Sequence, residues 1–313
     1  PLYRQSLVLY QALPGTELGQ AECLYNLAIT LSDQNKSTEA ESVHRQALAL
    51  YQTIPGTERD QADCLHDLAN TLDELDKPAQ AEPFFREALA LYQTIPSTQH
   101  EQARCLYNLA NTLHKLGKNA QAEPLYRQAI TLYQTIPGTQ QKQANCLNNL
   151  ATCMLNLRKL SHAESLYYQA LTLYQKIPGT EYEQATSTYS LATTLLSQGK
   201  LDPTEALYQD ALKQAVSAAL FNDEYRYQLS SPTKRRAWVT NRAQPSMILA
   251  IALAGVLEEA SLVAELVAKW RMVGSLAALP AARNSDIFLI TTMPDFTPEP
   301  EETLTRTPGP NLV

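Results

Sequence analysis

Ile136-Pro137-Gly138-Thr139 belongs to a set of five nearly identical loop sequences that reveal an internal repeat. The phrase recurs, with small changes, at residues 13–16, 54–57, 95–98 and 177–180, and each proline lies 41 residues from the next. A strict period of this length indicates a repeat protein, in which each repeat is one supersecondary unit. The first two thirds of the chain are therefore expected to be an array of similar units.

Each unit has the pattern of a helical hairpin. Its first helix, helix A, carries apolar residues at the i, i+3, i+4, i+7 spacing of one helix face, for example Leu106, Leu109, Ala110 and Leu113. After a polar break at residues 117–119, helix B carries a second stripe: Ala122, Leu125, Tyr126, Ala129, Ile130 and Tyr133. A lone hairpin cannot bury these stripes, so neighbouring hairpins must stack. The predicted fold is an all-α, right-handed superhelical solenoid of 41-residue hairpins.

The loops between units agree with this prediction. Pro-Gly after helix B ends that helix, because proline lacks an N–H and glycine tolerates positive φ. The threonine that follows is expected to cap the next helix A, and Thr98 with Glu101 and Thr180 with Glu183 have the spacing of a capping box. Pro83 and Pro124 are expected near the start of helix B, where a missing N–H costs least.

The chain divides into three predicted parts. Residues 1–218 form the solenoid, residues 219–283 a helical cap or connector, and residues 284–313 a mostly disordered tail that is poor in apolar side chains. The apolar run at residues 247–257 is too short to span a membrane and is expected to be a buried helix. Residues 1–5 reproduce residues 124–128, so the sequence is expected to begin inside a repeat.

The apolar and glycine positions of one unit resemble the tetratricopeptide signature, at Leu109-Ala110, Leu113, Gly117, Ala122, Tyr126 and Ala129. The phrases at residues 107–110 and 122–126 resemble the longer repeats of kinesin light chains. The resemblance covers about residues 1–218. It implies a scaffold that binds a protein or peptide in a concave groove, and it leaves the partner open because this scaffold serves many ligands.

A second resemblance concerns the region after the repeats. Residues 221–238 and 264–276 resemble the helical connector that precedes a caspase-like CHAT domain in bacterial repeat proteins. The alternative function is therefore a sensor or regulatory arm of a larger protease-like protein. The catalytic domain itself is missing, because no His or Cys occurs after position 162. A cap that shields the last repeat explains residues 219–274 equally well.

Charge and targeting signals narrow the function classes. The chain has 32 acidic and 25 basic side chains and a formal net charge of −7, which disfavours nucleic-acid binding. The only basic cluster is at residues 234–236, which also fits a solvated helix start. No export signal or membrane-spanning run is present, so a cytoplasmic location is expected. Exposed apolar ends of the array would allow self-association.

The sequence predicts neither an enzyme nor a metal or cofactor site. Cys23, Cys64, Cys105 and Cys146 recur once per repeat at one position of helix A, so they are expected one layer apart in the stack and not converging on a metal. They and Cys153 are expected to be small buried core residues. The five histidines lie at different repeat positions and form no recognisable catalytic arrangement with Cys or Ser.

The candidate site is a ladder of polar residues on helix A that the apolar stripe does not use. By resemblance these residues face the concave groove, where amide side chains can hold a peptide backbone and Tyr rings supply apolar contact. The alternative is that they are hydrated groove residues copied by repeat duplication. The predicted groove residues are Tyr25, Asn26, His66, Asp67, Asn70, Tyr107, Asn108, Asn111, Asn148, Asn149, Thr152 and Tyr189.

Overall fold

The computed structural model describes residues 2–198, 206–216 and 244–257. These residues form helices and connecting turns without any strand, as the repeat pattern predicts. A further helical stretch covers residues 206–216. The helices are α1 Leu2–Gln11, α2 Glu17–Asp33, α3 Ser37–Tyr51, α4 Glu58–Glu74, α5 Pro78–Thr94, α6 Gln99–Lys115, α7 Asn119–Thr135, α8 Gln140–Asn156, α9 Leu160–Tyr174, α10 Glu181–Ser197 and α13 Gln244–Val256.

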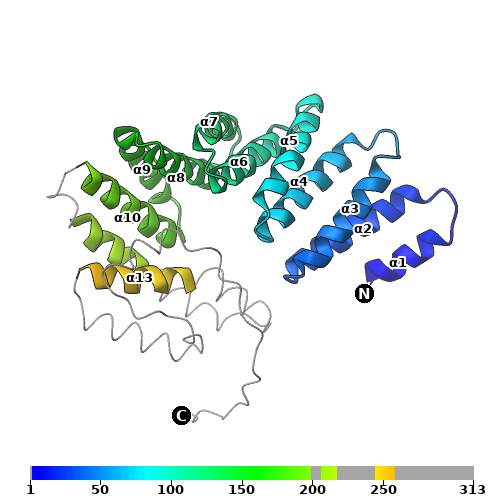
Figure 1. Ribbon diagram of the computed structural model, residues 1–313, viewed down its shortest axis with the longest axis horizontal. Coiled ribbons are helices and arrows are strands. Elements are labelled where there is room, and N and C mark those ends of the chain that lie inside the picture. The colour runs from blue at the N-terminus through cyan, green and yellow to red at the C-terminus, as the bar shows by residue number, and fades with distance from the viewer. Residues whose placement is uncertain (1, 199–205, 217–243, 258–313) are drawn as a thin grey trace, which may run out of the picture.

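From α1 to α10, each helix packs against the next one in the sequence, so the hairpins stack in chain order. Figure 1 shows these helices as an arch, with α4, α6 and α8 along its inner side and α5, α7 and α9 along its outer side. Smaller contacts join successive even-numbered helices directly. Helix A of each repeat therefore lines the inner surface, and helix B covers the outer surface. The predicted solenoid is confirmed.

The predicted stripes form the core. All four members of the helix A stripe on α6 are buried, as are Ala122, Tyr126, Ala129 and Tyr133 on α7. Leu125 and Ile130 are half-buried and pack against the core from its edge. One continuous apolar cluster runs from α2 to α10, because each hairpin shares its apolar faces with both neighbours. The five cysteines are free and buried, as predicted.

The threonine that opens each helix A does not cap it through its side chain, which corrects the capping-box prediction. Thr98 makes no side-chain cap hydrogen bond; its hydroxyl instead donates back to the Tyr92 carbonyl oxygen at 2.6 Å. Gln102 donates to both the Thr98 hydroxyl and the same carbonyl, each at 3.0 Å. Thr180 likewise turns back to the Tyr174 carbonyl. The loop threonine therefore closes the end of helix B, because that end leaves carbonyls unsatisfied.

The prolines of helix B lie deeper in their helices than predicted. α5 begins at Pro78 and α7 at Asn119, so Pro83 and Pro124 are each the sixth helical residue. Their missing N–H groups therefore fall beyond the first turn, where an intrahelical bond is lost. The prediction of a helix start close to these prolines was wrong, since tertiary packing extends the helix by more than a turn before them.

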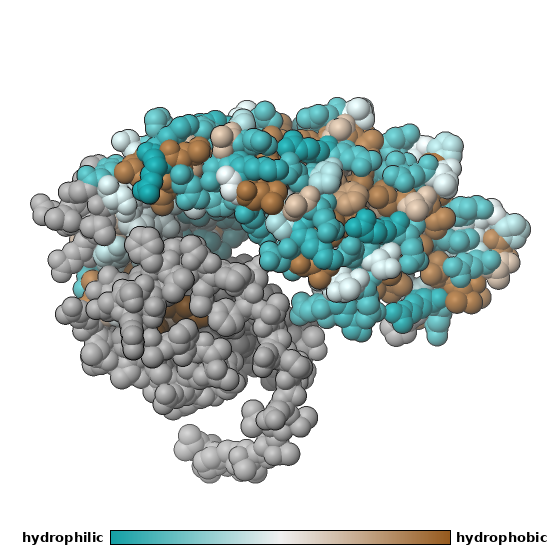
Figure 2. Space-filling view, in the orientation of Figure 1, coloured by the Kyte–Doolittle hydropathy of each residue, from teal (hydrophilic) through white to brown (hydrophobic). Residues whose placement is uncertain are grey.

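A repeated ion-pair arrangement follows the outer surface, which is largely hydrophilic (Figure 2). On α3, α5 and α7, a glutamate binds the arginine four residues later and the lysine that precedes the next helix B. The three sets are Glu41 with Arg45 and Lys77, Glu82 with Arg86 and Lys118, and Glu123 with Arg127 and Lys159, at 2.7–3.0 Å. Exposed pairs of this kind contribute about 0–1 kcal/mol each. We call this series the outer ion-pair ladder.

α13 packs on the end of the array. Met247, Ala250, Leu253 and Ala254 are buried in a second apolar cluster with Ala185 of α10 and residues of the 206–216 helix. The expected buried helix at residues 247–257 is confirmed.

Within the described residues, no helix has the length and apolarity needed to cross a membrane. The basic run at 234–236, the tail at 284–313 and the segments that resemble a CHAT connector lie outside the described residues, and the three-part domain division stays a prediction.

Candidate binding groove

Residues at i, i+3, i+7 and i+10 of each even-numbered helix lie on one face, next to the buried stripe. On α4 these residues are Asp63, His66, Asn70 and Asp73, and on α6 they are Arg104, Tyr107, Asn111 and His114. Because stacking places equivalent helices side by side, the faces join into one inner surface. We call the residues that line it, together with the residue after each i+3 position, such as Asp67, Asn108 and Asn149, the inner ladder.

A hydrogen-bond network joins α4 to α6 in this ladder. His66 is 1 % exposed, and its Nδ1 lies 3.0 Å from Asp67 Oδ1. A carboxylate only accepts, so Nδ1 donates and Nε2 accepts from Asn108 Nδ2 at 3.1 Å. Asn108 Nδ2 also donates to Asn70 Oδ1 at 2.9 Å. His66 is thus too buried to touch a ligand, and it holds Asn108 in place instead.

A second network joins α6 to α8. Asn149 Nδ2 donates to Asn111 Oδ1 at 2.9 Å and to the Tyr107 hydroxyl oxygen at 3.1 Å. The Tyr126 hydroxyl, which comes from α7, donates to the same Asn111 oxygen at 2.6 Å. Asn148 donates to Asn149 Oδ1 and accepts from Ser187 of α10. The amide side chains of successive repeats therefore fix one another's orientation in the unbound protein.

An open cleft of about 310 Å3 lies over these networks. It contains five of the predicted residues, namely Asn70, Asn108, Asn111, Asn149 and Thr152. Four other lining residues were not predicted. Asp73 and His114 lie three residues after predicted positions on the same face, so the helical spacing could have identified them. Lys115 and Tyr126 carried no such signal. The four unpredicted lining residues are Asp73, His114, Lys115 and Tyr126.

The remaining predicted residues lie along the ladder outside this cleft. Tyr25 donates from α2 to Asp67 Oδ2 at 2.7 Å. Asn26 is half-buried and donates to the Glu22 carbonyl of its own helix. Tyr189 of α10 lies against the ring of Tyr208, with ring centroids 5.9 Å apart.

The charged groups of the ladder are held in their ionised forms by their neighbours. Burial raises the pKa of Asp67, but hydrogen bonds from His66 and Tyr25 more than offset it, so this pKa lies below its usual value. Burial and the Asp67 carboxylate raise the pKa of Tyr25, which remains a neutral donor. Burial lowers the pKa of Arg104, but Asp67, Tyr92 and Asp63 together more than offset this effect, so the pKa of Arg104 lies above its usual value.

The metal-ligating side chains of the described residues do not converge on one site. No group of three or more His, Cys, Asp or Glu side chains among these residues could hold a metal ion. Burial raises the pKa of Cys64, Cys105 and Cys146 to about 12, so each is a neutral thiol at physiological pH. A thiol in this form is a poor nucleophile.

Several solved structures share this fold. Nearly identical TPR-like repeats assigned to a kinesin light chain of Podosopora anserina superpose with a TM-score of 0.54 and 17% identity, covering 63% of this chain and 94% of that one. The apo form of RapI gives a TM-score of 0.61 with 11% identity, over 86% and 73%. A Rap protein in complex with Competence and Sporulation Factor gives 0.51 with 15% identity, over 83% and 75%.

At these identities the structures show a common fold alone. No curated protein matches the chain significantly in sequence. A family model described as "Tetratricopeptide repeat" matches residues 1–53, 38–94, 60–135, 101–176 and 142–215. These overlapping matches follow the stacked hairpins from the first described helix to the 206–216 helix. The chain therefore belongs to the tetratricopeptide repeat family.

Proposed function

We propose that this protein is a non-catalytic scaffold that binds an extended segment of a partner protein in its inner groove. The observation that carries the proposal is the amide-lined cleft across α4, α6 and α8. Three successive repeats contribute to it, so a ligand several residues long could contact all of them. The complex of a similarly folded Rap protein with Competence and Sporulation Factor supports this class of function.

The amides of the cleft are suited to a peptide backbone. Both side-chain hydrogen bonds recorded at Asn108 use Nδ2, which leaves Oδ1 to accept a backbone N–H. Because neighbouring repeats already orient these amides, little side-chain entropy is lost on binding. Each such hydrogen bond contributes about 0.5–1.5 kcal/mol. Two of them, one at Asn108 Oδ1 and one at the second lone pair of Asn149 Oδ1, would change affinity about 5- to 150-fold.

Peptide selection tests the proposal. Random peptides displayed on phage are enriched on the wild-type protein, and the dissociation constants of the selected peptides are then measured for Asn108→Ala/Asn149→Ala. We expect a loss of affinity of about 5- to 150-fold. Gln128→Ala, on the exposed face of α7, is the matched control and should bind as the wild type does. Circular dichroism confirms that each variant folds. Equal affinities for wild type and the double variant would exclude the cleft as the binding site.

A further inference from the structure

The outer ion-pair ladder changes composition at α9. In the three preceding helix B segments the glutamate is followed by Arg45, Arg86 or Arg127. The 41-residue period places Glu164 and Tyr168 of α9 at the equivalent positions. The carboxylate is thus retained, whereas a neutral aromatic ring replaces the arginine. Since the repeats are otherwise similar, this position distinguishes α9 from its predecessors.

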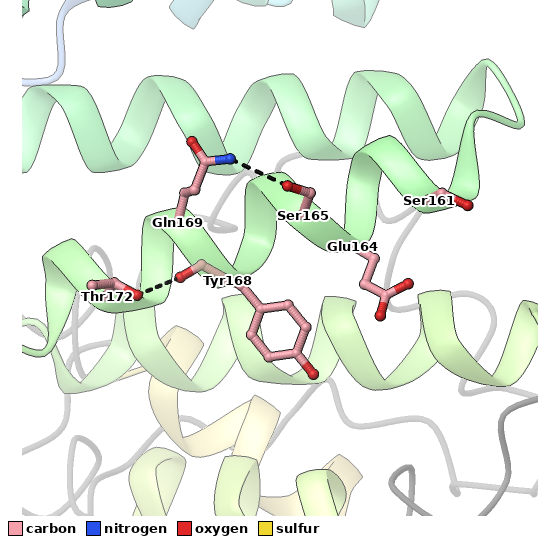
Figure 3. Close-up of a pocket in the computed structure, with 6 residues that line it drawn as sticks. All are labelled: Ser161, Glu164, Ser165, Tyr168, Gln169 and Thr172. Atoms are coloured by element: carbon pink, nitrogen blue, oxygen red, sulfur yellow. Dashed lines mark hydrogen bonds between the residues drawn. The ribbon is translucent and has the colours of Figure 1, made fainter.

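The surrounding surface of α9 is an open depression. It has a volume of about 450 Å3 and is lined by Ser161, Glu164, Ser165, Tyr168, Gln169 and Thr172. Figure 3 shows the Glu164 carboxylate and the Tyr168 ring side by side on one flank of α9, with Gln169 and Ser165 on the other flank. Tyr168 is 48% exposed, and the other exposed large hydrophobic side chains of the described residues all lie between positions 2 and 18. An aromatic ring and a carboxylate therefore lie on the same face of α9.

We propose that this face of α9 binds an arginine side chain presented by a partner protein. The partner would supply the guanidinium that Arg45, Arg86 and Arg127 supply within the chain at equivalent positions. A planar guanidinium pairs with a carboxylate and stacks on an aromatic ring, which a lysine ammonium does less well. The chain already contains an arginine over a ring, with Arg45 Cζ 5.4 Å from the centre of Phe84.

Glu164 can accept an arginine even while its carboxylate interacts with another group. In each preceding repeat one glutamate holds an arginine on Oε1 and a lysine on Oε2 at the same time, as Glu41 does with Arg45 and Lys77. A carboxylate at this position can therefore accept a guanidinium in addition to another partner. The site is on the outer side of the arch and is independent of the inner groove.

Titration with a small probe tests the site. N-acetyl-arginine-N-methylamide is added to the full chain at millimolar concentrations, and the ring resonances of Tyr168 are followed by NMR. We expect saturable shifts, and binding at least about threefold weaker for the corresponding lysine compound. Glu164→Gln should weaken arginine binding, because the carboxylate charge is removed. A wild-type protein that gives no saturable shift overturns the proposal.

Two further variants use the repeat as an internal control. Tyr168→Arg restores the composition of the outer ion-pair ladder and should abolish probe binding while leaving the thermal unfolding transition unchanged or higher. Arg127→Tyr reproduces the α9 pair on α7 and should create a second binding site there. Both positions are exposed, so both variants are expected to fold. Probe binding that persists in Tyr168→Arg, or that does not arise in Arg127→Tyr, contradicts the proposal.

Discussion

At the scale of single residues, the loop threonine shows what a sequence pattern can and cannot reveal. Its strict recurrence predicts a fixed role in every repeat, and Thr57, Thr98, Thr139 and Thr180 are all buried. The pattern could not tell which helix the hydroxyl serves, because a threonine between two helices can bond to either. In the structure the hydroxyl donates a hydrogen bond to a carbonyl oxygen at the end of helix B in each of these four loops.

Thr98→Val should lower the free energy of unfolding by about 1–2 kcal/mol. The change removes the hydrogen bond from the Thr98 hydroxyl to the Tyr92 carbonyl and the hydrogen bond from the Gln102 amide to that hydroxyl. The measurement is urea unfolding followed by circular dichroism. Thr94→Val is the matched control: its exposed hydroxyl donates to the Leu91 carbonyl of the same helix, and its loss should cost less than about 0.5 kcal/mol. Equal costs at the two positions would contradict the proposed role of the loop threonine.

His44 should make stability depend on pH. It is 1% exposed, and burial lowers its pKa from 6.5 to about 4. Between these values the unfolded chain binds a proton that the folded chain does not, so stability falls as the pH drops through this window. The loss should reach about 2–3 kcal/mol between pH 7 and pH 4.

His44→Phe removes this contribution, and the next repeat has Phe85 at the equivalent buried position. Unfolding free energies of wild type and variant are measured from pH 7 to pH 4. As the pH falls, the unfolding free energy of the wild type should decrease more than that of the variant. Parallel curves would show that burial of His44 does not shift its titration.

At the scale of helices, the apolar spacing predicted the existence and order of all hairpins but not their exact bounds. The turn between helix B and the next helix A needs one residue at positive φ, which is glycine at four of its five occurrences. Ser97 has φ 61° at this position. A left-handed conformation costs a residue with a Cβ about 1–2 kcal/mol.

Ser97→Gly should therefore raise the free energy of unfolding by about 1 kcal/mol. The reverse change, Gly138→Ser, should lower it by a similar amount, although a Cβ at Gly138 meets no atom within 4 Å. Both changes are measured by urea unfolding. Because the site is open, the two effects should be opposite in sign; effects of the same sign would show that backbone strain is not their cause.

At the scale of the whole molecule, the period of 41 residues was sufficient to predict a solenoid of stacked hairpins, because each hairpin must bury its apolar faces against the next. The resemblance to tetratricopeptide repeats pointed to twelve polar residues of helix A, and five of them line the observed cleft. It could not predict that His66 is buried or that Asn149 bonds to Asn111, because such contacts depend on how far one repeat is shifted relative to its neighbour. The period shows that Tyr168 stands where earlier repeats have arginine, but only the structure shows that those arginines pair with glutamate.

Self-association through the array ends remains a prediction. α1 exposes Leu2 at 76%, Val8 at 65% and Leu9 at 68%, and Figure 2 shows hydrophobic side chains at this end of the array. A surface of this kind favours contact with another apolar surface. Light scattering over a hundredfold range of concentration should show a dimer or larger species for the wild type and a smaller one for Leu9→Lys. A monomer at every concentration would contradict self-association.

The inner groove as the binding surface is tested most directly by site-specific photo-crosslinking in living cells. A benzophenone amino acid replaces Lys115, which lines the cleft, or Gln128 on the outer face of α7. The expected result is a discrete crosslinked partner protein from position 115 and none from position 128. Crosslinking of the same partner with equal yield from both positions, or from position 128 alone, would contradict binding in the groove.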